Sequence, residues 1–186
     1  VTQSSASEVE QNLVFQDDAG NKVNISKFIK DTTDGSVTYF DGRDNQFTGV
    51  GSPKSRATAD LNDNFRNITY GPYSLYELSQ GGDNLAIGYK AGYNTTVGSK
   101  NVFIGNEAGL SNTASSSNIA IGYQSAKSTL GSDNIILASN GTATMNFGAK
   151  NIVLVNHPSA LNTLSPNNDN IIIGGRDAVP FIRGYV

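Results

Sequence analysis

The second half of the chain repeats a short block made of one asparagine, three apolar residues and, in most copies, one small residue. The six copies begin at Asn84, Asn101, Asn118, Asn134, Asn151 and Asn170. Successive asparagines are 17, 17, 16, 17 and 19 residues apart. A nearly constant period of this length is typical of a solenoid, in which each repeat stacks on the next.

Each apolar block predicts a short β-strand, because it is rich in Ile, Val and Leu and is flanked by turn-forming residues. The first three copies continue with a second short motif, as in residues 88–92, so one repeat holds two short strands and two turns. This is too short for a β-α-β unit, which needs about 30 residues. We therefore expect a mostly β fold in which about six parallel coils stack over residues 81–175, about 4.8 Å apart.

Alternation along the strand predicts which side chains fill the coil. The first and third apolar positions are large in every copy, as in Leu85 and Ile87, and we expect them inside. The middle position then faces outward and is also apolar, with Ala86, Phe103, Ala120, Ile136, Val153 and Ile172 in the six copies. Identical chains packed around an axis would cover such a stripe. These six residues are therefore predicted to make the subunit contacts of a homo-oligomer.

The recurring asparagine has two interpretations. One is a stacked ladder, in which the side-chain amides hydrogen-bond along the coil axis and to turn backbones. The other is an exposed ridge that binds a ligand. We favour the ladder, because such ladders are common in stacked β architectures.

The first copies carry the pattern Asn-apolar-Ala-Ile-Gly-x-x-Ala, from Asn84 to Ala91 and, with a final serine, from Asn118 to Ser125. This pattern resembles the head repeats of trimeric autotransporter adhesins and is similar to the related repeats of bacteriophage tail fibres. The resemblance covers residues 83–174 and weakens where other residues replace the glycine. It implies a left-handed parallel β-roll in a homotrimer, and it brings no catalytic residues with it.

Residues 1–80 lack the repeat and predict an attachment or capping region of mixed α+β structure. The apolar segments 13–15 and 23–25 flank residues 17–21, with the sequence DDAGN, which predicts a β-hairpin with a Gly-containing turn. Its two aspartates leave a calcium loop as an alternative, although the spaced oxygen ligands of a known loop are missing.

A short helix is expected to follow, with Thr58 as its N-cap. Its apolar face would contain Leu61, Phe65 and Ile68.

Tyr70, Tyr73 and Tyr76 cluster just before the first predicted coil. An open coil end exposes strand edges and core, so we interpret these tyrosines as a cap of that end. A carbohydrate-stacking surface is the alternative, because exposed aromatic groups mark binding sites. The apolar tail, residues 176–186, is expected to cap the far end or to connect to a further fibre segment.

Composition narrows the function classes. The 186 residues include no cysteine, which excludes disulfides and thiolate metal sites, and the formal net charge of −3 gives no reason to expect nucleic acid as a partner. No apolar run reaches the roughly 20 residues needed to span a membrane. We expect no cofactor and no metal.

Catalytic chemistry has little support. The chain has one histidine, His157, and no nucleophile-elbow pattern. Paired carboxylates would be needed to hydrolyse a glycan. The acidic residues of the coil region are spread over different coils, at Asp83, Glu107, Asp133, Asp169 and Asp177.

We therefore expect a structural protein rather than an enzyme: a homotrimeric shaft of a phage tail fibre or virion appendage that contributes to host attachment. Its partners would be its own copies, other tail proteins through residues 1–80, and a glycan or protein of the host surface. The polar start of the chain lacks a signal-peptide core. This favours the virion over the alternative, the head of an autotransporter adhesin on a bacterial surface, unless the chain is a fragment. A glycan-degrading tailspike is a third hypothesis.

Overall fold

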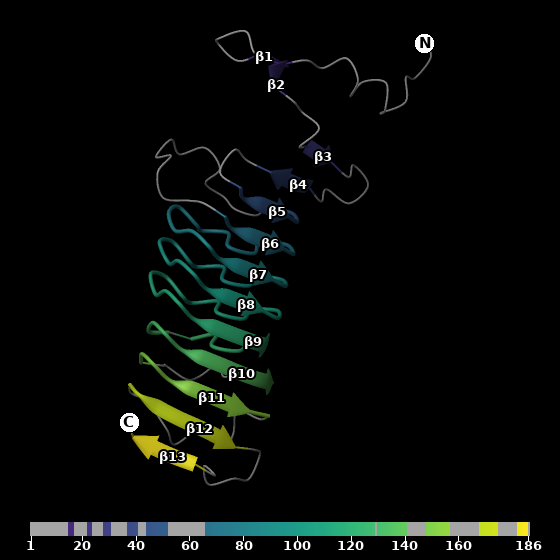
Figure 1. Cartoon of the computed structure of the whole chain (residues 1–186). Helices are drawn as coiled ribbons and strands as arrows, with labels where there is room; N and C mark the ends of the chain where they lie inside the picture. Colours follow the sequence, from purple (N-terminus) through teal and green to yellow (C-terminus); the bar gives the residue numbers. More distant parts are fainter. Residues whose placement is uncertain are drawn as a thin grey trace.

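The computed structural model describes residues 15–16, 22–23, 28–30, 37–40, 44–51, 66–128, 130–140, 148–156, 168–174 and 182–185. Within these residues the chain forms thirteen strands and no helix (Figure 1). The strands are β1 (Phe15–Gln16), β2 (Lys22–Val23), β3 (Phe28–Lys30), β4 (Val37–Phe40), β5 (Gln46–Thr48), β6 (Ile68–Tyr70), β7 (Leu85–Ile87), β8 (Val102–Ile104), β9 (Ile119–Tyr123), β10 (Ile135–Asn140), β11 (Ile152–Val155), β12 (Asn170–Gly174) and β13 (Ile182–Tyr185).

Strands β3 to β13 form one sheet whose order follows the sequence, while β1 and β2 pair as a separate antiparallel unit. From β5 to β12 every neighbouring pair is parallel, with one register shift between Leu137 and Asn140 of β10. These eight strands stack along one side of a rod, and between β6 and β9 the chain returns through turns that stack in the same direction (Figure 1). The mostly β coil predicted from the repeat period is therefore present, and it is a β-solenoid.

The solenoid begins before residue 81. Strands β5 and β6 are parallel to β7 and in register with it, so residues 46–48 and 68–70 already belong to the stacked sheet. Upstream of β5 the direction reverses, because β4 pairs antiparallel with β5 and β3 antiparallel with β4. The first two coil strands thus lie in the region that the sequence suggested was an attachment or capping region.

The prediction of a short helix near residue 60 is wrong at the C-terminal end of that helix. Ile68 is the first residue of β6 and is exposed. Thr58, Leu61 and Phe65 lie outside the described residues, as do the aspartates of the hairpin turn. Within the described residues, the N-terminal region contains strands in place of the mixed α+β structure that we expected.

The facing of the strand residues is the reverse of the expected one. The middle residues Ala86, Phe103, Ala120, Ile136, Val153 and Ile172 are all buried inside the coil, so they cannot make subunit contacts. The asparagine explains the reversal. Asn84 is buried, and because side chains alternate along a strand, Ala86 lies on the same inner side while Leu85 and Ile87 point outward.

Small residues make room in the core for Phe103, the largest fully buried side chain among the described residues. Its register neighbours on β7 and β9 are Ala86 and Ala120. On the opposite wall, a Cβ atom at Gly92 would lie 2.7 Å from a Phe103 ring carbon, and one at Gly109 would lie 2.3 Å from another. Around β8 the interior therefore accepts a phenyl ring because the adjacent positions are small.

Glycine four residues after the asparagine lets successive turns touch. Gly88 and Gly105 have φ angles of 126° and 128°, a region that side chains rarely adopt. A Cβ atom at Gly105 would lie 2.4 Å from the carbonyl oxygen of Gly122 in the next coil. These turns stack more closely than any other residue permits.

The end of the chain pairs with the last coil. Strand β13 lies antiparallel to β12, with Arg183 opposite Ile172 and Ile182 opposite Ile173. Of the tail for which the sequence suggested a cap or a connection, the described part thus lies along the edge of β12 (Figure 1).

Candidate subunit interface on the outer sheet face

Two columns of large apolar side chains run along the outward face of the parallel sheet. We call them the outer sheet face. One column is Ile68, Leu85, Val102, Ile119, Ile135, Ile152 and Ile171, and the other is Tyr70, Ile87, Ile104, Ile121, Leu137, Leu154 and Ile173. Every one of them is exposed or half-buried. The parallel register places each residue beside its counterpart in the next coil, so the two columns are continuous.

The exposed area of this face is large for a chain of this size. Its seven most exposed side chains are Ile68, Tyr70, Ile87, Ile135, Leu137, Ile152 and Leu154. At roughly 200 Å² for a fully exposed large side chain, these seven alone expose on the order of 600 Å². That equals the upper end of the largest apolar patch on a typical monomer, about 300–600 Å². The half-buried residues of the two columns add to it.

Behind this face the asparagines form a continuous internal ladder. In Asn101, Nδ2 donates to Oδ1 of Asn84 at 3.0 Å and to the carbonyl oxygen of Ser115 at 3.0 Å. Its Oδ1 accepts from the backbone N and from Nδ2 of Asn118, at 3.0 and 3.3 Å. The same side-chain bond links Asn45, Asn67, Asn84, Asn101, Asn118, Asn134, Asn151 and Asn170.

All eight ladder asparagines are buried. Their amides are used inside the coil, so they form no exposed ridge for a ligand. Asn45 and Asn67 were missed by the search for three apolar residues after an asparagine, because Gln46, Thr48 and Thr69 are polar. A search for asparagine followed by glycine four residues later finds both, at 45–49 and 67–71.

Strands β6 to β9 of the outer sheet face each lie between two residues with positive φ. The residue before each ladder asparagine forms one column, the leading edge: Asp44, Arg66, Asp83, Lys100, Ser117, Asp133, Lys150 and Asp169, with φ between 54° and 62°. The residue six positions after the asparagine forms the other, the trailing edge: Tyr73, Lys90, Glu107 and Gln124, with φ between 53° and 58°. Backbone hydrogen bonds stack both columns, such as Lys100 N to Gly82 O and Glu107 N to Tyr89 O.

Ion pairs form along each edge. On the leading edge, Arg66 donates Nε to Oδ1 of Asp83 at 2.6 Å and Nη2 to Oδ2 at 3.0 Å. These hydrogen bonds hold the pKa of Asp83 below its usual range. On the trailing edge, Lys127 and then Gln124 donate to Oε2 of Glu107, at 2.6 and 2.8 Å, and lower the pKa of Glu107.

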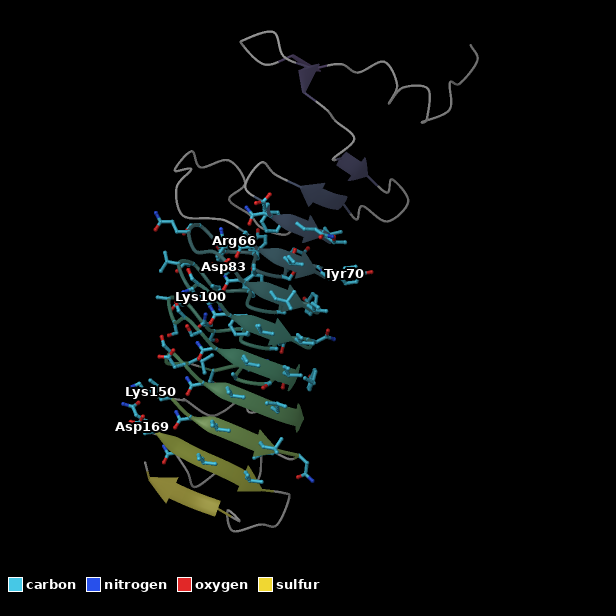
Figure 2. All side chains as sticks on the ribbon, in the orientation of Figure 1. Arg66, Tyr70, Asp83, Lys100, Lys150 and Asp169 are labelled. Carbon is cyan, nitrogen blue, oxygen red and sulfur yellow. The ribbon has the colours of Figure 1, made fainter. Side chains whose placement is uncertain are left out.

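The tyrosines do not cap an open coil end, because β5 stacks above β6 and the core continues past them. Tyr70 belongs to the outer sheet face, 65% exposed, and projects at the opposite end of its strand from Arg66 (Figure 2). Tyr73 contacts Tyr76 edge to face with ring centroids 5.7 Å apart, and Tyr76 stacks on Tyr93 at 5.0 Å. These ring contacts make the tyrosines part of the solenoid side wall.

A metal site and a membrane span have no support among the described residues. They hold no cluster of three or more His, Asp or Glu side chains placed to bind a metal ion. They also contain no helix long and apolar enough to cross a membrane. His157 lies outside the described residues.

Comparison of this chain with protein-family models, with curated proteins and with solved structures finds no match. The likeness of its repeats to those of adhesin heads and tail fibres therefore rests on the sequence pattern alone.

Proposed function

We propose that this chain builds a rigid shaft segment of a homotrimeric fibre, with a structural rather than a catalytic role. The observation that carries the proposal is the outer sheet face, a continuous apolar surface along the rod. A surface of this kind is costly to leave in water, at about 25 cal/mol for each Å². Covering it with other chains makes the shaft both stable and straight.

The proposed cover is further copies of the same chain. A typical stable interface buries about 800 Å² from each partner, and the outer sheet face is of that order once its half-buried residues are included. The face has a constant chemistry along the rod, because every coil contributes the same kind of side chain at the same two positions. Copies that lie parallel would therefore meet apolar surface at every level. The number three is supported by the resemblance of the repeats to trimeric adhesins and tail fibres.

We place the fibre on a phage tail or virion appendage, where it would contribute to host attachment. The repeat pattern supports this placement. The part of residues 1–80 that precedes β5 would dock to other tail proteins, and a host glycan or protein would be the target. The head of a bacterial autotransporter adhesin is the alternative, since its repeats share the same pattern.

A glycan-degrading tailspike is the candidate from a different class. Incubation with glycans of a host envelope separates it from the shaft, because a structural shaft releases no reducing sugar. Release that is lost on changing Glu107 to Gln would replace the structural proposal with the enzymatic one.

The mass in solution tests the proposal most directly. We expect sedimentation equilibrium of the whole chain to give about three times the monomer mass of 19.6 kDa. The double variant Ile152→Lys/Leu154→Lys changes two residues of the outer sheet face that are 43% and 49% exposed. We expect it to be monomeric and folded, because two lysines cannot be buried there without partners.

Val97→Lys is the matched control. Val97 is also 43% exposed but lies in the return segment of its coil, outside the sheet. It should leave the trimer intact. A wild-type chain that stays monomeric at micromolar concentration, or a double variant that stays trimeric, contradicts the proposal.

A further inference from the structure

Charge alternates along the leading edge of the sheet. From β6 to β12 the sequence is Arg66, Asp83, Lys100, Ser117, Asp133, Lys150 and Asp169, all of them exposed. Figure 2 shows Arg66, Asp83, Lys100, Lys150 and Asp169 along the same end of the strands. The alternation supports neighbouring coils, as the Arg66–Asp83 pair shows. It also means that the leading-edge residue of each coil differs in charge from the leading-edge residues of the coils above and below it.

The trailing edge carries the opposite pattern at the same heights. In the coil of β7, the leading edge carries Asp83 and the trailing edge carries Lys90. In the coil of β8, the leading edge carries Lys100 and the trailing edge carries Glu107. In the coil of β9 both positions are uncharged, with Ser117 and Gln124.

These opposite charges cannot meet within one chain. Lys100 and Glu107 lie beyond the two ends of β8, whose three residues alone span about 10 Å at about 3.3 Å per residue, so the two side chains start from opposite edges of the sheet. In a closed ring of parallel copies, however, each contact joins one side of a chain to the other side of the next. If the outer sheet faces turn inward, the leading edge of one copy meets the trailing edge of its neighbour.

We propose that the two edges form complementary ion pairs between copies, and that these pairs fix the axial register of the fibre. The inference rests on the proposed function. In register, Asp83 of one copy faces Lys90 of the next, and Lys100 faces Glu107. A shift of one coil in one direction brings Asp83 against Glu107 and Arg66 against Lys90. A shift in the other direction brings Lys100 against Lys90. Of these three alignments, only the in-register one pairs opposite charges at both heights. A slip of two coils would pair Asp44 with Lys90 and Arg66 with Glu107, but it would leave two coils of each outer sheet face uncovered.

The trailing-edge side chains have the capacity for a second partner. Among the described residues, the bonds from Lys127 and Gln124 to Glu107 both end on Oε2, so Oε1 can accept from a donor of another copy without breaking them. Lys90 lies 5.1 Å above the ring centroid of Tyr89 and 5.4 Å from that of Tyr93. The rings hold its ammonium group in place, and the hydrogen bond with Tyr89 raises the pKa of Lys90, so the group stays protonated.

The apolar columns cannot supply this register by themselves. Because the coils of β7 to β12 present Ile, Leu or Val at the same two positions, a slip of one coil leaves most of the apolar contact unchanged. Like charges placed opposite each other are unfavourable and exclude wrong alignments. The charged edges thus supply the specificity, and the outer sheet face supplies the affinity.

A charge-exchange cycle on the whole chain tests the inference. Lys100→Glu and Glu107→Lys each place like charges at one contact, and we expect each to raise the dissociation constant of the oligomer about tenfold at low salt. The double variant Lys100→Glu/Glu107→Lys restores the opposite charges between copies, so its dissociation constant should return to within about threefold of wild type. Sedimentation equilibrium at 50 mM and at 1 M NaCl measures all four proteins, and the differences should shrink at 1 M, where charge is screened.

The double variant is decisive because each change also disturbs pairs within the chain. If only those pairs mattered, the double variant would be weaker than either single one, since the two sites are too far apart to compensate each other. Lys90→Glu/Lys100→Glu is the control. It places like charges at both contacts, between residues 83 and 90 and between residues 100 and 107, so its dissociation constant should rise more than that of either single variant.

Failure of the proposed function and failure of the proposed register give different results. A wild-type chain that is monomeric overturns the proposed function. A wild-type oligomer whose affinity the Lys100→Glu/Glu107→Lys exchange does not restore overturns only the register.

Discussion

The coils from β6 to β9 and those from β10 to β12 share one ladder and one sheet but turn differently. In the early coils the residue four positions after the asparagine is Gly71, Gly88, Gly105 or Gly122, with φ between 121° and 134°. In the coils of β10 and β11 it is Ala138 or Val155, and both side chains are buried. The strands lengthen near this change, from three residues in β8 to five in β9 and six in β10.

This difference separates two roles within the repeat. The asparagine ladder and the parallel register persist through both regions, so they set the stacking. Glycine with a positive φ at this position is confined to the earlier coils, whose turns touch, so it sets how tightly the chain leaves the strand there. Gly174 holds the same position in β12 without a positive φ. The register shift between Leu137 and Asn140 marks the change from one kind of turn to the other.

The largest expected effect comes from closing the space at a tight turn. Gly105→Ala adds a Cβ atom 2.4 Å from a backbone oxygen at a φ of 128°. Strain and overpacking together should cost about 4 kcal/mol of unfolding free energy. At the equivalent position of the later region, Ala138→Gly should cost only about 1 kcal/mol. Urea unfolding measures both, and equal costs would show that the two turns do not differ.

Emptying the core should have the next largest effect. Phe103→Ala should lower the unfolding free energy by about 3–4 kcal/mol, because the small residues around the ring cannot collapse to fill the cavity. Val153→Ala in the later region removes less volume and should cost about 2 kcal/mol. Thermal unfolding followed by circular dichroism would rank the two variants. A smaller loss for Phe103→Ala than for Val153→Ala would contradict the packing described above.

Breaking the ladder at its centre should cost more than breaking it at its last asparagine. Asn101→Ala leaves the backbone N and Nδ2 of Asn118 without their acceptor in a buried site, which should cost about 3 kcal/mol. Asn170→Ala, at the last ladder position among the described residues, should cost about 1 kcal/mol. Amide hydrogen exchange gives a local readout. In Asn101→Ala, faster amide exchange should extend from residue 101 into both adjacent coils. In Asn170→Ala, faster exchange should be confined to β12 and the strand paired with it through the ladder, β11.

The smallest expected effect is a dependence on pH in the early coils. The hydrogen bonds from Lys127 and Gln124 lower the pKa of Glu107 in the folded chain. The stability that this carboxylate contributes is therefore complete above its unfolded pKa of about 4.3 and is lost as the pH falls through the lower folded value. We expect the melting temperature of wild type to fall by a few degrees more than that of Glu107→Gln between about pH 6 and about pH 3. Parallel curves for the two proteins would exclude this contribution.

The sequence located the coil strands but not the side of the coil on which their residues lie. Both faces of each strand are apolar, so hydrophobicity alone gave no reason to prefer Phe103 over Val102 for the core. The large outer residues suggested the wrong choice. The side chain that decides the facing is polar: Asn101 is buried because the ladder satisfies its amide, and Phe103 follows on the same side.

The start of the solenoid was also hidden by composition. Asn45 and Asn67 complete the ladder, but their strands contain Gln46 and Thr69, so the apolar block is not visible there. Because these two coils were not visible in the sequence, we interpreted Tyr70, Tyr73 and Tyr76 as the cap of a coil end. Their place in the side wall followed only once β5 and β6 were seen to continue the sheet.

Period and residue type in the sequence determined that this chain is a stack of short parallel strands with turns of fixed length, because a repeated backbone path requires repeated turn residues. The tertiary structure decided which residues form the core and which form the outer face. That choice depends on the buried hydrogen bonds of the ladder, which join residues one full coil apart. The same stacking brings Lys90 and Glu107, 17 residues apart in the sequence, into one charged edge opposite Asp83 and Lys100.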